Sequence, residues 1–473
     1  MACSDIPARL DRLPWSRWHW RVVLLLGSAW MLDGLEVTLV GAFGSVLERP
    51  ETLGLSPSDV GLAGSAYIAG AVLGALVFGR MADVLGRKRL FLATLAVYAF
   101  ATLASGLATA PWFFVLCRFA TGLGIGGEYA AINSAIDEFV PARVRGRVSL
   151  AINGSFWLGA IVGAGMSLIL LDESRIPVAW GWRLGFILGT LLALFLALLR
   201  HGIPESPRWL LTHGRSTEAE RIVDDIEQGI IARHGPLPPV PTSARISLGA
   251  RPSPRLAEIA RVLVKVYRRR SAVALSLMVS QAFFYNAIFF TYTLVLTRFY
   301  AVPDTRVGVY LFPFALGNVL GPLVLGPLFD RVGRRRMIAF TYVAAGLGLA
   351  ATGWAFMQGW LDARTQTLCW SAVFFLASAA ASSAYLTVSE IFPLEMRALS
   401  ISLFYAVGTG IGGMAGPALF GVLVESGRPA AIAAGYVMAG TLVIAGGLIA
   451  LKYGVNAERR PLEEIAPPLT ARR

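Results

Sequence analysis

Charged residues are scarce in this sequence. Only 15% of its 473 residues are Asp, Glu, Lys or Arg, while 56% are hydrophobic. An average soluble domain carries about 25% charged residues. This shortage excludes an ordinary soluble domain and indicates an integral membrane protein.

Cysteine and histidine are also rare, with 3 and 4 residues respectively. Cys3, Cys117 and Cys369 lie far apart, so neither a disulfide framework nor a metal site is expected. The sequence also lacks a phosphate-binding loop and a nucleophile elbow. We therefore expect no cofactor and no enzymatic activity.

Long apolar runs, by contrast, are abundant. Twelve runs of roughly 20 residues are each long enough to cross a bilayer as a helix. They fall at 21–45, 60–80, 90–109, 112–138, 149–171, 182–200, 271–298, 306–328, 337–357, 367–391, 399–424 and 430–452. The sequence thus predicts an all-α membrane protein with twelve transmembrane helices in two six-helix halves.

Polar segments flank and divide these runs. We expect an N-terminal tail (1–20), a first half (21–200), a central loop with surface helices (201–270), a second half (271–452) and a C-terminal tail (453–473). Most of the Lys and Arg residues lie in the tails, the central loop and the other even-numbered loops. By the positive-inside rule, both termini are expected in the cytoplasm, in a membrane that we expect to be a bacterial inner membrane. The net charge of +13 is then a topology signal, and no nucleic-acid partner is expected.

Two motifs occur twice. The segment "GRMADVLGRKR" from Gly79 returns as "GPLFDRVGRRR" from Gly326. The segment "EFVPARVRG" from Glu138 returns as "EIFPLEMRA" from Glu390, at nearly the same offset. This duplication indicates two halves in parallel repeat, with a cavity between them.

These motifs resemble those of the major facilitator superfamily, and the resemblance covers essentially the whole chain. "RFATGLGIGGEY" from Arg118 and "PESPRWL" from Pro204 are similar to its sugar-porter and organic-ion branches, and the first span resembles that of the synaptic-vesicle-glycoprotein-like group. "EFVPARVRG" departs from the sugar-porter pattern, so the substrate need not be a sugar. The resemblance implies a cytoplasmic gate of ion pairs, formed by Asp83, Arg87, Glu138, Arg145, Glu205, Arg208, Asp330, Arg334, Glu390 and Arg397.

Two acids interrupt the first apolar run. Asp33 and Glu36 lie three residues apart in "SAWMLDGLEVTLVGAF", so they share one helical face. A charge at this depth costs about 2.5–3.5 kcal/mol on insertion, so it usually faces a cavity and a partner. The resemblance implies an ion pair with Arg118 that couples transport to protons. We favour Glu36 over Asp33 as the acid, keep Glu128 as a second proton site or ion-pair partner, and leave a static buried pair as the alternative.

Polar and aromatic residues in several spans are expected to line the substrate cavity. "QAFFYNAIFFTYT" places Gln281, Tyr285 and Tyr292 on roughly one face, and the resemblance implies substrate contacts for Gln281 and Asn286. Further candidates are Asn153 and Trp157 at i and i+4, Tyr67, Asn318, Tyr385 and Tyr405. Each could instead make an interhelical hydrogen bond or pack as an aromatic.

The sequence therefore favours a monomeric secondary transporter that imports a small polar organic solute, an organic acid or a sugar-like metabolite, by proton symport. A proton-coupled exporter of drugs or metabolites ranks lower, because the glycine-proline motif typical of such exporters is absent from 149–171. A non-transporting membrane receptor or assembly protein ranks lower still, because no long luminal domain is present to bind a partner.

Overall fold

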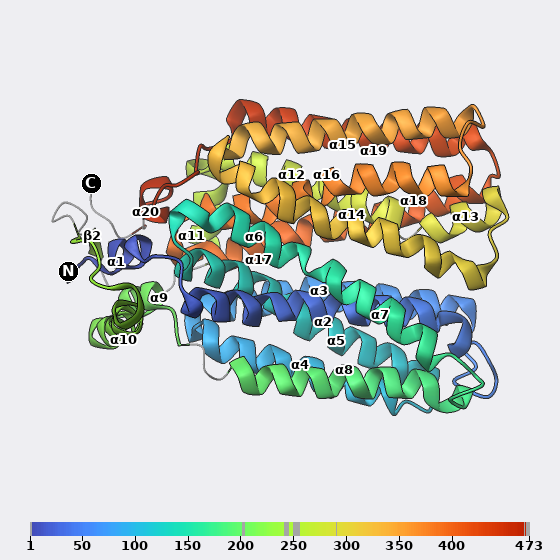
Figure 1. Cartoon of the computed structure of the whole chain (residues 1–473), viewed down its shortest axis with the longest axis horizontal. Coiled ribbons are helices and arrows are strands. Elements are labelled where there is room, and N and C mark those ends of the chain that lie inside the picture. The colour runs from blue at the N-terminus through green and yellow to red at the C-terminus, as the bar shows by residue number, and fades with distance from the viewer. Residues whose placement is uncertain are drawn as a thin grey trace.

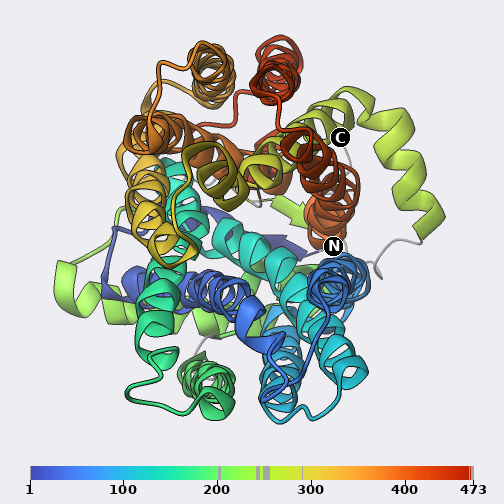
Figure 2. The ribbon, with the colours of Figure 1, turned by 90° about the vertical axis from the view of Figure 1, so that its right-hand side faces the viewer.

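The computed structural model describes residues 2–200, 204–240, 246–248, 256–289, 291–467 and 469. Long helices run side by side through most of its length, and both termini lie at the same end of the bundle (Figure 1). We call this end, which also carries α1, α9, α10 and α20, the terminal end. Viewed along the bundle, the helices of the first half gather on one side and those of the second half on the other (Figure 2).

The first half contains six spans. They are formed by α2 (Arg17–Leu47), α3 (Pro57–Leu85), α4 (Arg87–Gly106), α5 (Pro111–Phe139), α6 (Arg145–Gly154) with α7 (Phe156–Leu170), and α8 (Val178–Arg200). A 3₁₀ turn, η1 (Ala142–Val144), precedes α6.

The second half repeats this order. Its spans are α12 (Arg268–Phe289) with α13 (Tyr292–Tyr300), α14 (Asp304–Arg331), α15 (Arg334–Met357), α16 (Ala363–Glu390), α17 (Arg397–Gly408) with α18 (Met414–Glu425), and α19 (Pro429–Tyr453). The turn η4 (Leu394–Met396) precedes α17, and a π-helical stretch, η5 (Thr409–Gly413), joins α17 to α18.

The predicted twelve-helix architecture is confirmed. By length and composition, eleven of the spans in the described part are apolar enough to cross a membrane. The twelfth, α5, is 29 residues long and carries Arg118 and Glu128 among its apolar residues. The halves meet where α3 packs on α17 and where α6 and α7 pack on α14.

Two spans are interrupted where the apolar pattern predicts one continuous helix. Ser155 separates α6 from α7, so Asn153 and Trp157 do not share an unbroken helical turn. The second interruption separates Phe289 from Tyr292. The shared face of Tyr292 with Gln281 and Tyr285 stays a prediction, because Tyr292 lies in α13 and the other two residues lie in α12.

Tyr292 has a local structural role. Its hydroxyl donates to the Val307 carbonyl at 2.8 Å, and its ring stacks on Phe314 and packs edge-on against Trp370. All of these partners belong to the second half.

Small residues bring α2 and α7 into direct backbone contact. A Cβ added at Gly34 would lie 1.8 Å from the Phe156 carbonyl oxygen, and one added at Gly159 would lie 1.8 Å from the Met31 carbonyl oxygen. Glycine is therefore needed at both positions, and the close approach fixes α2, which carries both acids, against the rest of the half.

Short elements cover the terminal end. These are β1 (Ala2–Ser4), α1 (Ile6–Arg12), α9 (Pro207–Thr212), α10 (Ser216–His234), β2 (Ile246–Leu248), α11 (Leu256–Arg261), the π-helical η3 (Val262–Val266) and α20 (Leu462–Ile465). A separate apolar cluster joins α1 to α9 and α10. The segment 232–254 lies partly outside the described residues, and within it β2 pairs antiparallel with β1.

Candidate functional site

Glu36 on α2 and Arg118 on α5 form a buried ion pair inside the first half. Their closest atoms, Glu36 Oε1 and Arg118 Nη1, are 2.5 Å apart, and the side chains are 3% and 1% exposed. Arg118 also donates to the Thr121 hydroxyl at 2.6 Å and the Ser105 hydroxyl at 3.2 Å. The ring of Phe186 lies 5.1 Å from its guanidinium carbon. The predicted pairing of Glu36 with Arg118 is thus confirmed.

Asp33 has a different set of partners, although it lies one turn before Glu36. Its two carboxylate oxygens accept hydrogen bonds from the hydroxyls of Tyr67 on α3 and Tyr129 on α5. Asp33 is 1% exposed. Of the two acids, Glu36 is therefore the one that pairs with Arg118, while Asp33 binds the two tyrosines. Residues i and i+3 point about 60° apart around a helix, and this angle directs the two carboxylates to different neighbours.

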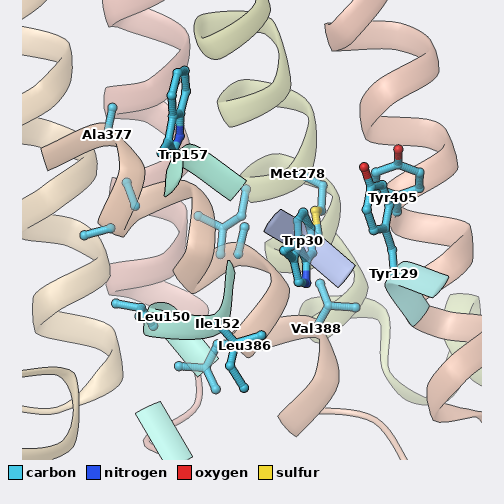
Figure 3. Packing of buried hydrophobic residues seen from close by; sticks show 14 of the residues in the cluster. Trp30, Tyr129, Leu150, Ile152, Trp157, Met278, Ala377, Leu386, Val388 and Tyr405 are labelled. Atoms are coloured by element: carbon cyan, nitrogen blue, oxygen red, sulfur yellow. The ribbon is translucent and has the colours of Figure 1, made fainter. Parts of the chain in front are cut away.

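Aromatic rings from both halves pack together beside Tyr129, one of the two tyrosines that bind Asp33. Trp30, one turn earlier on α2, stacks on Tyr129 at 4.5 Å and meets Tyr385 of α16 edge-on at 5.5 Å. Tyr129 also meets Tyr405 of α17 edge-on at 4.9 Å. Figure 3 shows Trp30, Tyr129 and Tyr405 among the packed buried hydrophobic residues. The Asp33 carboxylate therefore lies where the two halves meet.

Hydrogen bonds also connect the two halves. The indole Nε1 of Trp157 on α7 donates to the Tyr285 hydroxyl on α12 at 2.9 Å, and Tyr285 donates to the Asn318 side-chain oxygen on α14. The Trp157 ring also packs edge-on against Phe289 and Phe314. Three of the predicted lining residues are thus joined in one chain of contacts.

The remaining predicted lining residues make local contacts or sit nearby. Asn153 donates to the Asn133 side-chain oxygen at 3.2 Å, and Asn286 donates to a carbonyl of its own helix. Gln281 is half-buried, one turn before Tyr285. Glu128 is 1% exposed on α5, next to Tyr129.

At the terminal end, each half contains an acid–arginine–acid cluster. In the first half, Arg87 lies 2.9 Å from Glu138 and 3.3 Å from Asp83. Asp83 also accepts a hydrogen bond from the backbone of Leu399 at 3.1 Å. Because Leu399 lies in the first turn of α17, the carboxylate of the first half lies at the N-terminus of a helix of the second half, where negative charge is favoured.

The second half contains an equivalent cluster, and its contacts cross to the first half. Arg334 lies 3.0 Å from Glu390 and 2.9 Å from Asp330. Asp330 accepts from the backbones of Gly146 and Arg147, at 2.9 and 2.8 Å, at the start of α6 in the first half. Both clusters therefore hold the two halves together at this end.

Glu205 is predicted to belong to an ion-pair gate, and in the structure it caps a helix. Its carboxylate accepts hydrogen bonds from the backbones of Arg87 and Lys88, at 2.9 and 3.2 Å, and so caps α4. Glu458 makes the equivalent contact with the backbone of Arg334 at the start of α15, at 3.3 Å.

Arg208 on α9 links the tails to the bundle. It donates to the carbonyls of Asp137 and Glu138, and its guanidinium lies 3.4 Å from Asp11 and 3.2 Å from Glu463. Burial opposes its charge, but these carboxylates outweigh burial and raise the pKa of Arg208 above its ordinary value.

Two further arginines of the predicted gate lie nearby. Arg145 is 3.7 Å from both Glu390 and Asp11. Arg397 donates to the Phe392 carbonyl at 3.4 Å. The predicted gate residues are thus gathered at one end of the molecule, although Arg397 makes its described contact with backbone.

Comparison with known proteins decides the family. The family model described as "Sugar (and other) transporter" matches residues 22–468. The chain belongs to this family. It is a membrane transporter of the major facilitator superfamily, as its motifs and twelve helices indicate.

Curated relatives and a solved structure support this assignment. The transporter is 27% identical over 418 residues to the niacin transporter NiaP of Acinetobacter baylyi, covering 87% of this chain and 89% of that one. It is 26% identical over 410 residues to the 4-hydroxybenzoate transporter PcaK of the same organism, covering 85% of each. It shares the fold of the proton:xylose symporter XylE bound to 6-bromo-6-deoxy-D-glucose, with a TM-score of 0.74, 17% identity, and 94% and 98% of the two chains covered.

Several residues of the two candidate sites were not predicted from the sequence. Trp30 and Tyr129 belong to the group of aromatic residues beside Asp33. Asp11, Glu458 and Glu463 belong to the clusters at the terminal end. Trp30 could have been found, because it precedes Asp33 by one helical turn. The partners of the tail acids are far away in the sequence, so no local pattern reveals them.

Proposed function

We propose that this transporter imports a small organic acid together with a proton, by alternating access, across a bacterial inner membrane. The observation that carries the proposal is the buried Glu36–Arg118 pair, which lies one helical turn from Asp33 and its tyrosines. The bacterial relatives support the location, and the concentration of basic residues at the terminal end supports cytoplasmic termini.

Glu36 is the proposed proton carrier. When it is ionised, it neutralises Arg118; when it takes a proton, Arg118 becomes a buried cation without its counterion. Leaving one member of a buried pair alone costs about 3–5 kcal/mol. Protonation would therefore favour a different arrangement of the half in which the pair sits, and this is what coupling requires.

Asp33 is proposed to shape the substrate site. Its carboxylate holds the hydroxyls of Tyr67 and Tyr129 and thereby fixes the Tyr129 ring against Trp30 and Tyr405. Glu128 stays a candidate for a second proton site.

The proposed substrate class is an aromatic monocarboxylate. The curated names of two relatives refer to niacin and 4-hydroxybenzoate, each of which is an aromatic ring bearing one carboxyl group. The aromatic side chains around Asp33 offer faces for stacking such a ring, and the Trp157, Tyr285 and Asn318 side chains offer hydrogen-bonding groups.

The clusters at the terminal end are the proposed gate. Asp83 and Asp330 each bind the start of a helix in the opposite half, so the halves must separate there before substrate can leave toward the cytoplasm. Ion pairs between elements that move apart suit a two-state switch.

The test is uptake into proteoliposomes. Purified protein is reconstituted, and uptake of radiolabelled nicotinate, 4-hydroxybenzoate, xylose and a neutral aromatic amide is compared with and without an inward proton gradient. We expect gradient-driven accumulation of at least one aromatic acid and none of the amide. Accumulation of xylose alone, or uptake of acids that ignores the gradient, would overturn the proposal.

A further inference from the structure

A hollow of about 580 Å³ opens at the terminal end of the molecule. It is lined by Trp15, Ser16, Arg17, Trp20, Arg233 and His234. The first four belong to the start of α2 and the residues just before it, and the last two end α10. We call it the interfacial hollow.

The ionisable side chains that line the interfacial hollow are all basic. Arg17, Arg233 and His234 are exposed, and no acid is among its lining residues. The Arg147 guanidinium lies 6.0 Å from the centre of the Trp15 ring and adds a further cation behind it. Several basic side chains around one concavity attract an anion.

The wall formed by α2 changes from basic to apolar along the helix. Arg17, Trp20, Arg21 and Leu24 follow the spacing i, i+3, i+4 and i+7, so they form one exposed stripe. Trp20 is 55% exposed and Leu24 is 67% exposed. Tryptophan is enriched where a helix passes from headgroups into acyl chains, so this stripe crosses the membrane surface at Trp20.

We propose that the interfacial hollow binds the phosphate headgroup of an anionic phospholipid. Arg17 and Arg233 contact the phosphate, and the acyl chains lie along Trp20 and Leu24. A soluble phosphate would satisfy the basic side chains alone, whereas a lipid also covers the exposed apolar stripe. Because the hollow joins α2 to α10, a bound lipid ties the central loop to the first half.

The experiment measures lipid binding by native mass spectrometry. Detergent-purified protein is titrated with phosphatidylglycerol or phosphatidylcholine, and, in a separate arm, glycerol 3-phosphate is added as a soluble competitor. The test variant is Arg17→Gln/Arg233→Gln. The matched control, Arg89→Gln/Arg221→Gln, removes two exposed arginines at the same end that do not line the hollow.

We expect one high-affinity phosphatidylglycerol and binding of phosphatidylcholine at least tenfold weaker. In the test variant we expect a loss of roughly 30-fold in affinity, which is roughly fivefold per arginine. The single Arg233→Gln variant should show a smaller loss, and it replaces the double variant if that does not purify.

Three results would overturn the proposal. One is equal binding of the two lipids, and a second is the same loss in the control as in the test variant. The third is full competition by glycerol 3-phosphate, which would assign the hollow to a soluble anion.

Discussion

Two carboxylates on one turn of α2 have unlike environments. Glu36 is paired with a cation, whereas Asp33 is held by two tyrosine hydroxyls at the interface between the halves. Their different partners give them different proposed tasks, coupling for Glu36 and shaping of the site for Asp33. The spacing of the two acids in the sequence does not distinguish them, because spacing carries no information about which residues of α3 and α5 face each acid.

Removing one member of the buried pair should destabilise the protein more than removing both. Arg118→Gln leaves Glu36 in an apolar interior without its cation, which costs about 3–5 kcal/mol. In Glu36→Gln/Arg118→Gln, two neutral amides can hydrogen-bond to one another, so much of the loss should be regained. Thermal unfolding in detergent measures both variants. Equal melting temperatures for the single variant and the wild type would contradict this account.

At the scale of elements, the terminal helices are held by charge as well as by apolar packing. Arg9 of α1 lies 2.6 Å from Glu227 of α10, and Arg12 lies 2.6 Å from the same carboxylate. Burial opposes ionisation of Glu227, but the hydrogen bonds from Arg9 and Arg12 outweigh burial and hold the pKa of this carboxyl below its ordinary value of 4.5.

This contact predicts a pH dependence for the docking of α1. A carboxyl whose folded pKa is lowered stabilises the fold fully above its ordinary value and loses that contribution as the pH falls through the folded pKa. Docking of α1 should therefore weaken below about pH 4.5. Hydrogen–deuterium exchange of residues 2–13, corrected for intrinsic rates, should rise there in the wild type.

Two variants on α10 sharpen this test. In Glu227→Gln, exchange of α1 should already be raised at neutral pH and should depend less on pH. The control Glu220→Gln, at an exposed position of the same helix, should behave like the wild type. The same pH response in Glu227→Gln as in the wild type would assign the effect to another group.

The close approach of α2 and α7 gives a second prediction. Gly159→Ala places a methyl group against the Met31 carbonyl, so the helices must separate, at a cost of about 1–3 kcal/mol. Gly165 lies on the same helix and has nothing within 4 Å of an added Cβ. Gly165→Ala should therefore be neutral or slightly stabilising. Thermal unfolding compares the two variants, and an equal loss in both would show that the contact with α2 is not the cause.

Hydropathy predicted the spans well but missed their interruptions. An apolar run indicates the length of a segment and that its surroundings are lipid or protein. Both properties are the same whether the segment forms one helix or the two helices α12 and α13. The segment "QAFFYNAIFFTYT" contains neither proline nor glycine, so no local signal marks the end of α12 at Phe289. At the start of α13, Tyr292 packs against Phe314 and Trp370, and such tertiary contacts cannot be read from the run itself.

At the scale of the whole molecule, the duplication predicted the terminal clusters but not the asymmetry at the centre. Arg118 and Trp370 both follow the residues Leu-Cys and precede Glu138 and Glu390 by the same number of positions. Arg118 binds Glu36 in the first half, whereas Trp370 packs against Tyr292 in the second. The two halves therefore share the ion-pair cluster at the terminal end, while the Glu36–Arg118 pair belongs to the first half.

Because of this asymmetry we propose that proton coupling belongs to the first half, and one measurement tests this proposal most directly. Glu36→Gln protein in proteoliposomes is compared with the wild type and with Glu51→Gln, which changes an exposed acid remote from the pair. Exchange of labelled for unlabelled substrate needs only alternating access, whereas accumulation needs coupling to the proton gradient. We predict that Glu36→Gln retains exchange and loses gradient-driven accumulation, while Glu51→Gln retains both. Full gradient-driven accumulation by Glu36→Gln would contradict the coupling role of the Glu36–Arg118 pair.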